Sequence, residues 1–356
     1  MTIDPARRSA LLGIKLATLV RDHAGEAPIA ASTLPGGAAL TRLGEAWVLA
    51  DVAPQRILGQ ALAWSRRQPD ITVLNVLVDV GTTDARAGLS ERSESERDGA
   101  VATERGIDTA AIVARRAGAF VGDIRVWEVH DRTLLAAASE PVSAVPTVQP
   151  ELMALSGEIA AAGADPLCEW GVLVGEVEGL EVCRVVRSDE TGEVVLQVGI
   201  GAHDREAFAM LHGDRPPLVA LQGVVQAVAP HRVLNAAPHA LNRIATERLL
   251  RASLINSPGI VGAARLVAND PPVPRVNVKD PVPCVATGVD GQGTALTVVC
   301  SVGIDLDLVP FAADARIRHG GRLIVVVPER DAHAVTLDQL SLLREPAVLV
   351  TVPSPV

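Results

Sequence analysis

The chain of 356 residues has no tyrosine, three phenylalanines and four tryptophans, and its only lysines are Lys15 and Lys279. So few aromatic side chains leave little material for the stacking platforms that bind single-stranded nucleic acid or sugars. The formal net charge of −10 also disfavours a broad nucleic-acid surface, because such surfaces are usually basic. The longest uncharged runs, such as residues 323–328, are far shorter than the ~18 apolar residues that cross a bilayer, so no membrane partner is predicted.

Several enzyme motifs are also missing. The sequence contains no complete dinucleotide-binding glycine motif, P-loop, nucleophile elbow or zinc-protease HExxH motif. The four cysteines, Cys168, Cys183, Cys284 and Cys300, have no CxxC spacing, and most lie inside apolar runs. This pattern favours buried free thiols in a reducing compartment, and therefore a cytoplasmic protein without a bound cofactor.

What the sequence does contain is a strand-to-helix pattern that recurs. In residues 296–316 an apolar β-branched run ends in Val302-Gly303-Ile304, two aspartates follow, and Pro310 begins a predicted helix. Residues 194–211 repeat the order: a Val-Gly-Ile triplet, then His203 and Asp204, then a helix. Asp51 occupies a similar position after the predicted hairpin 38–50.

These corners predict an α/β protein. Its units, each a hairpin, helix, strand, helix and strand, are expected to repeat internally and form mixed sheets flanked by helices. One unit spans residues 38–129, a second spans 284–352, and a partial one lies between, so the two full segments are expected to superpose. The predicted domains are an N-terminal lobe (1–140), a linker and helix (141–165) and a C-terminal lobe (166–356) that contains two related units and a helical insert (205–255). Polar residues 81–106 predict a mobile loop.

The candidate site is the corner bearing Asp305 and Asp307. In extended chain, residues two apart point to the same side, so these carboxylates are candidates to share Mg²⁺ or Mn²⁺, with Asp290 as a further candidate. His203 and Asp204 form an alternative corner. An aspartate before a helix is equally suited to cap its free backbone amides, so helix capping stays open as the explanation for each corner.

A locally basic helical stretch follows the middle corner. Four arginines there are candidates for phosphate contacts: Arg232, Arg243, Arg248 and Arg251. A solvated helix face explains the same pattern.

The order of hairpin, helix, strand, helix and strand resembles the core of restriction-endonuclease-like nucleases in a degenerate form. The resemblance is topological and covers residues 183–211 and 284–352. It implies an acid on one hairpin strand and an acid with a lysine on the next. The matching positions read Val299-Cys300-Ser301, Leu196-Gln197-Val198 and Leu49-Ala50-Asp51, none of which supplies that pair.

Two functions follow as hypotheses. The first is a non-catalytic binding or assembly protein with a protein partner or a second copy of itself, because no complete catalytic motif is present. The second is a metal-dependent, nuclease-like hydrolase acting on nucleic acid, which uses Asp305 and Asp307, with Asp290 as a further candidate, to hold a metal that activates water.

Overall fold

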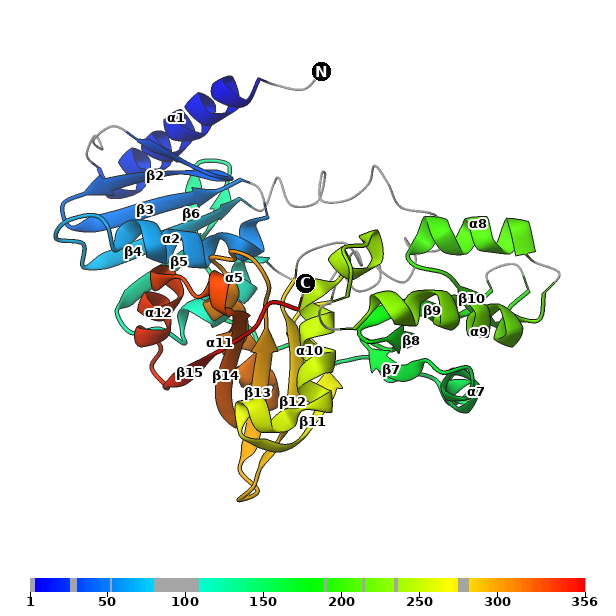
Figure 1. Ribbon diagram of the computed structural model, residues 1–356. Coiled ribbons are helices and arrows are strands. Elements are labelled where there is room, and N and C mark those ends of the chain that lie inside the picture. The colour runs from blue at the N-terminus through cyan, green and yellow to red at the C-terminus, as the bar shows by residue number, and fades with distance from the viewer. Residues whose placement is uncertain are drawn as a thin grey trace.

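The computed structural model describes residues 4–25, 31–51, 53–79, 109–188, 191–212, 215–233, 236–274 and 282–355. The predicted loop 81–106 lies outside these residues. The described strands form three sheets, which we call the N-terminal sheet (β1 to β6), the middle sheet (β7 to β10) and the C-terminal sheet (β11 to β15). Figure 1 shows the N-terminal and C-terminal sheets on either side of a layer of helices, with the middle sheet beside them.

The N-terminal sheet is mixed and keeps the order of the sequence. Its first three strands are antiparallel, β3, β4 and β5 run parallel, and β6 returns antiparallel to β5. Leu43 and Gly44 both have positive φ angles, as a two-residue hairpin turn between β2 and β3 requires. The strands are β1 (Ser32–Leu34), β2 (Gly37–Arg42), β3 (Glu45–Ala50), β4 (Val73–Asp79), β5 (Asp123–His130) and β6 (Thr133–Ala136).

Helices cover both faces of this sheet. The long helix α1 (Pro5–Ala24) lies on the outer face, where Leu16, Leu19 and Val20 pack against Trp47 and Leu77. On the inner face lie α2 (Ile57–Ser65), which the short turn η1 (Pro54–Arg56) precedes, and α5 (Thr109–Ala117).

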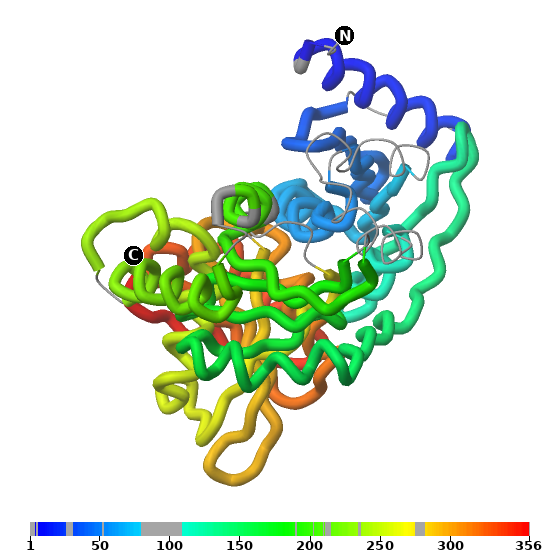
Figure 2. The backbone as a smooth tube through the Cα atoms, turned by 90° about the vertical axis from the view of Figure 1, so that its right-hand side faces the viewer, coloured from blue at the N-terminus to red at the C-terminus, as the bar shows by residue number. Residues whose placement is uncertain are grey.

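The middle sheet is a four-stranded antiparallel meander in the order β10-β9-β8-β7. Figure 2 shows its green strands in front of the orange strands of the C-terminal sheet. Its strands are β7 (Asp165–Glu169), β8 (Val172–Val177), β9 (Leu180–Arg187) and β10 (Val194–Val198). Its helical segments are α6 (Pro150–Met153), α7 (Ser156–Ala161), α8 (Ala202–His212), α9 (Pro217–Val228), η2 (Ala229–His231) and η3 (Ala240–Arg243).

The C-terminal sheet has the same kind of order as the N-terminal one. Strands β11, β12 and β13 are antiparallel, and β13, β14 and β15 run parallel. The strands are β11 (Ala263–Asn269), β12 (Cys284–Asp290), β13 (Ala295–Cys300), β14 (Arg322–Pro328) and β15 (Ala347–Val352). Around them lie α10 (Thr246–Asn256), η4 (Pro258–Val261), α11 (Leu308–His319), η5 (Glu329–Asp331) and α12 (Ala334–Ser341).

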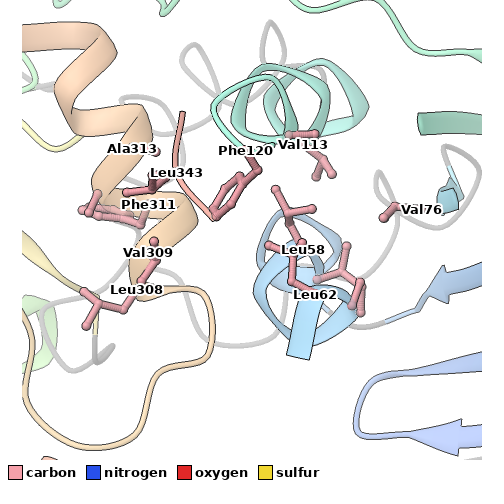
Figure 3. Close-up of a cluster of buried hydrophobic side chains, with 14 of the residues drawn as sticks. Leu58, Leu62, Val76, Val113, Phe120, Leu308, Val309, Phe311, Ala313 and Leu343 are labelled. Carbon is pink, nitrogen blue, oxygen red and sulfur yellow. The ribbon is translucent and has the colours of Figure 1, made fainter. Parts of the chain in front are cut away.

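One hydrophobic core joins the two mixed sheets. Leu58 of α2 and Val113 of α5 belong to the same buried cluster as Val309 and Phe311 of α11. Figure 3 shows these side chains converging from both halves of the chain, together with Phe120 and Leu343. A single bridge pairs Phe120 with Leu343, and the backbone N–H of Val121 donates to the carbonyl of Leu342. The N-terminal unit (β1 to β6 with α1, α2 and α5) and the C-terminal unit (β11 to β15 with α10 to α12) therefore share their interior.

The mixed α/β fold class is confirmed. Strand order and direction agree from β1 to β5 and from β11 to β15, and the helices fall at matching places. The repeat itself stays a prediction, because its test is superposition of the two segments. The middle sheet has no parallel pair among its described strands and differs from both units. The predicted C-terminal lobe thus contains two separate sheets, and α10, placed in the helical insert, covers the C-terminal sheet.

None of the helices in the described ranges combines the length and the apolar character needed to span a membrane.

Candidate functional site

The corner with Asp305 and Asp307 lies where the two mixed units meet. The Asp305 carboxylate accepts a hydrogen bond from the backbone N–H of Asp307 (2.9 Å) and pairs with Arg56 of η1 (2.8 Å). The Asp307 carboxylate accepts from the backbone N–H of Gly59 in α2 (3.0 Å) and from Arg116 of α5 (2.7 Å). Both aspartates of the C-terminal unit thus bind groups of the N-terminal unit.

Gly59 allows this close contact. A β-carbon at that position would lie 1.8 Å from the carbonyl oxygen of Leu306, well inside contact distance. The carbonyl of Gly59 accepts a hydrogen bond from Gln339 of α12 (2.7 Å), so both backbone groups of the glycine bind the C-terminal unit. The residue is needed here for space, because its neighbours leave no room for a side chain.

Two more charges complete a buried network at this junction. Asp314 of α11 is fully buried and binds Arg115 (2.6 Å) and Arg116 (3.2 Å). Two arginines therefore face two aspartates in the interior, which satisfies each charge with a partner. Burial raises the pKa of Asp307 to about 7, although the neighbouring Arg116 opposes that shift.

These contacts disfavour the predicted cation site, which stays a prediction. The carboxylate oxygens of Asp305 and Asp307 are already bound by guanidinium and amide groups, which leaves them poorly placed to hold Mg²⁺ or Mn²⁺. Asp307 stands directly before α11 but its side chain makes no capping bond to that helix, so simple capping does not describe it either.

Asp290 lies elsewhere. It ends β12 in the hairpin turn, at the opposite end of β13 from Asp305. Its carboxylate accepts from the backbone N–H groups of Gln292 and Thr294, both at 2.9 Å, and these bonds lower its pKa. Asp290 therefore stabilises a turn and does not join the other two aspartates.

The alternative corner is also separate. Asp204 accepts a hydrogen bond from the backbone N–H of Ile200 (2.6 Å), and the exposed His203 side chain lies 3.8 Å from Glu206. Figure 1 shows their helix, α8, on the opposite side of the molecule from α11 and α2. The acidic corners do not converge on one cleft.

Three of the four candidate phosphate-binding arginines are buried. Arg248 binds Glu176 and Glu169, each at 2.6 Å, and Arg251 binds Glu176 at 2.9 Å. Arg232 donates to four backbone carbonyls, among them those of Leu241 and Ile244. These guanidinium groups tie α10 and η2 to the middle sheet, so the predicted basic surface is wrong for them; only Arg243 is exposed.

A second charged group, which was not predicted as a group, lies at the carboxyl edge of the N-terminal sheet. Asp51 follows β3 and Asp79 ends β4, on neighbouring parallel strands in register. Because side chains alternate, both lie on the face that Leu49 and Leu77 share with α1. Arg8 of α1 pairs with Asp51 (2.6 Å), and Lys15 pairs with Asp79. A usable signal was the seven-residue spacing of Arg8 and Lys15, which places both on one helix face.

Within the described residues, no three histidine, cysteine or carboxylate side chains gather as a group that could hold a metal ion. Comparison with protein-family models, with curated proteins and with solved structures found no match.

Proposed function

We propose that the protein is a binding or assembly protein that takes an added β-strand at the free edge of β15. The supporting observation is a difference between the two mixed sheets. In the N-terminal sheet, β6 lies antiparallel along β5. In the C-terminal sheet, β15 takes the place of β5, and no described strand covers its outer edge.

The sequence of β15 suits this role. Its six residues, Ala347 to Val352, include no charged residue and no proline, and the Val348 side chain is 48% exposed. Proteins usually protect such an edge with charge, proline or a covering segment. Pro346 and Pro353 border the strand and limit the pairing to its six residues.

Strand addition draws its affinity from the backbone. An edge strand presents a row of N–H and C=O groups on one side, and an extended partner satisfies them while its alternate side chains supply specificity. The partner is a second copy of the chain or an extended segment of another protein. In either case β6 illustrates the geometry, because it pairs antiparallel with the last parallel strand.

The test is a charge on the edge. Val348→Lys is expected to abolish concentration-dependent association in sedimentation velocity, or the capture of a specific partner protein, because an edge lysine blocks strand pairing. Val219→Lys, on the exposed face of α9, is the matched control and should change neither. The proposal is contradicted if the wild type stays monomeric at high concentration and captures no partner protein that the Val348→Lys variant fails to capture.

A second candidate function is the metal-dependent hydrolase, with Asp51 and Asp79 in place of Asp305 and Asp307 as the metal ligands. The observation that favours it is the pair of carboxylates with a nearby lysine, Lys15, since the nuclease-like resemblance implies acids and a lysine together. Mn²⁺ would then replace Arg8 and Lys15 as the partner of the acids. The expected result is a rise in the melting temperature of the wild type with Mn²⁺ that Asp79→Asn removes. Equal responses of the two proteins contradict this candidate.

A further inference from the structure

Two of the four cysteines lie directly opposite each other on neighbouring strands. Cys284 begins β12 and Cys300 ends β13, and the two are register partners in this antiparallel pair. Directly opposed residues of antiparallel strands have Cα atoms roughly 4.5 to 5.5 Å apart, within the range that a disulfide spans. The other buried cysteine, Cys183, faces Gly175 and Val198 on its neighbouring strands.

The two thiols also interact. The Cys300 thiol hydrogen-bonds that of Cys284, and this bond together with burial raises the pKa of Cys300 well above its usual value. The Cys284 thiol in turn donates to the backbone carbonyl of Glu247 in the first turn of α10, at 3.0 Å. Arg251 of the same helix acts in the opposite direction without reversing the rise, so Cys300 keeps its proton while the pair is buried.

We propose that Cys284 and Cys300 are a redox-active pair that forms a reversible disulfide when a peroxide reaches it. When α10 moves aside, one thiol loses its proton to water and the thiolate attacks a peroxide oxygen. The O–O bond breaks, and a sulfenic acid forms as the leaving oxygen takes up a proton and departs as water or an alcohol. The second thiol then attacks the sulfenic sulfur, the S–S bond forms and water departs. The two thiols lose two electrons in total, which reduce the peroxide.

The location gives this chemistry a structural consequence. Leu250 and Leu254 of α10 belong to the buried cluster that contains both cysteines, so a peroxide reaches the pair only when α10 moves. Disulfide formation removes the thiol donor from the carbonyl of Glu247 at the start of that helix. Arg248 and Arg251 of α10 bind Glu176 of the middle sheet. The hydrogen bond that oxidation removes therefore belongs to the same helix that holds the middle sheet.

The experiment treats the native full-length chain with hydrogen peroxide, then alkylates free thiols in denaturant and maps the peptides by mass spectrometry. The expected product is a linked pair of peptides containing Cys284 and Cys300, two hydrogens lighter than the reduced pair and restored by a dithiol reductant. The exposed Cys168 is expected to react faster and to remain outside this disulfide.

Two variants complete the design. Cys300→Ser should leave Cys284 without an intramolecular disulfide, whereas Cys183→Ser, the buried control, should leave the linked peptides unchanged. The proposal is overturned if the native wild type keeps both thiols alkylatable after peroxide and forms the link only when unfolded. It is also overturned if peroxide takes either cysteine to a sulfinic acid without any link. Since the wild-type peptide map decides these outcomes, a variant that fails to fold does not affect them.

Discussion

Asp51 and the pair Asp305–Asp307 follow corresponding strands of the two mixed units, yet they are used differently. Asp51 lies at the carboxyl end of β3 and pairs with Arg8, whose side chain is 45% exposed. Asp307 is buried between the units and pairs with Arg116, whose side chain is 2% exposed. The comparison teaches that an acid after a strand identifies a place in the fold, while its chemistry depends on what the rest of the chain packs against it.

The largest difference between the two corners is expected when one arginine is removed from each. Arg116→Leu is expected to lower the free energy of unfolding by about 3 to 5 kcal/mol, because Asp307 and Asp314 lose a buried partner. Arg8→Leu, the matched change at the exposed corner, should cost less than about 1 kcal/mol. Urea denaturation of both variants measures the difference, and equal losses would mean that burial does not distinguish the corners.

The contact at Gly59 gives a smaller effect. Gly59→Ala is expected to lower the free energy of unfolding by about 1 to 3 kcal/mol, because its β-carbon collides with the carbonyl of Leu306. Gly223→Ala, in the middle of α9 with no atom near its β-carbon, should instead stabilise the protein by up to about 1 kcal/mol. Thermal unfolding of the pair checks both signs, and a neutral Gly59→Ala would show that the two units are not packed this closely.

The third prediction uses pH. The folded pKa of Asp307 is raised to about 7, so between about pH 4 and pH 7 the folded protein binds a proton that the unfolded chain has released. The stability of the wild type relative to Asp307→Asn should therefore fall as pH rises through that window, by at most about 1.4 kcal/mol per pH unit, and level off above it.

Asp290→Asn provides the contrasting control for that measurement. Hydrogen bonds from backbone N–H groups lower the pKa of Asp290, so the wild type should lose stability relative to this variant only as pH falls below the usual aspartate range. Unfolding titrations at a series of pH values separate the two slopes. If the stability difference between the wild type and Asp307→Asn does not change with pH, Arg116 keeps Asp307 ionised over the whole pH range.

Much of the fold could be predicted from the sequence because its signals are local. The hairpin 38–50 follows from two apolar runs around Leu43-Gly44, and β14 follows from an apolar stretch of the kind that is buried on both faces. The short β1 and the edge strand β11 gave weaker patterns. The separate middle sheet was missed because a meander and a hairpin of a mixed unit look alike until the partners are known.

The candidate site was harder because its partners are distant in sequence. Asp307 binds Gly59 and Arg116, which are 248 and 191 residues away, and no local spacing indicates such contacts. One signal was available, since Arg115 and Arg116 lie next to each other in a helix that is otherwise largely apolar. Charges within a buried helix require partners, and Asp314, in the buried first part of α11, was the matching one.

The interior shared by the two mixed units also has a consequence for the chain during its synthesis. The inner helices of the N-terminal unit leave the ribosome with β5, while the helix that covers them, α11, ends at His319. At roughly 5 to 20 residues per second, the earlier helices wait on the order of 10 to 40 seconds with their apolar sides uncovered. A nascent chain of this protein therefore exposes the apolar sides of α2 and α5 until α11 has been translated and packs against them.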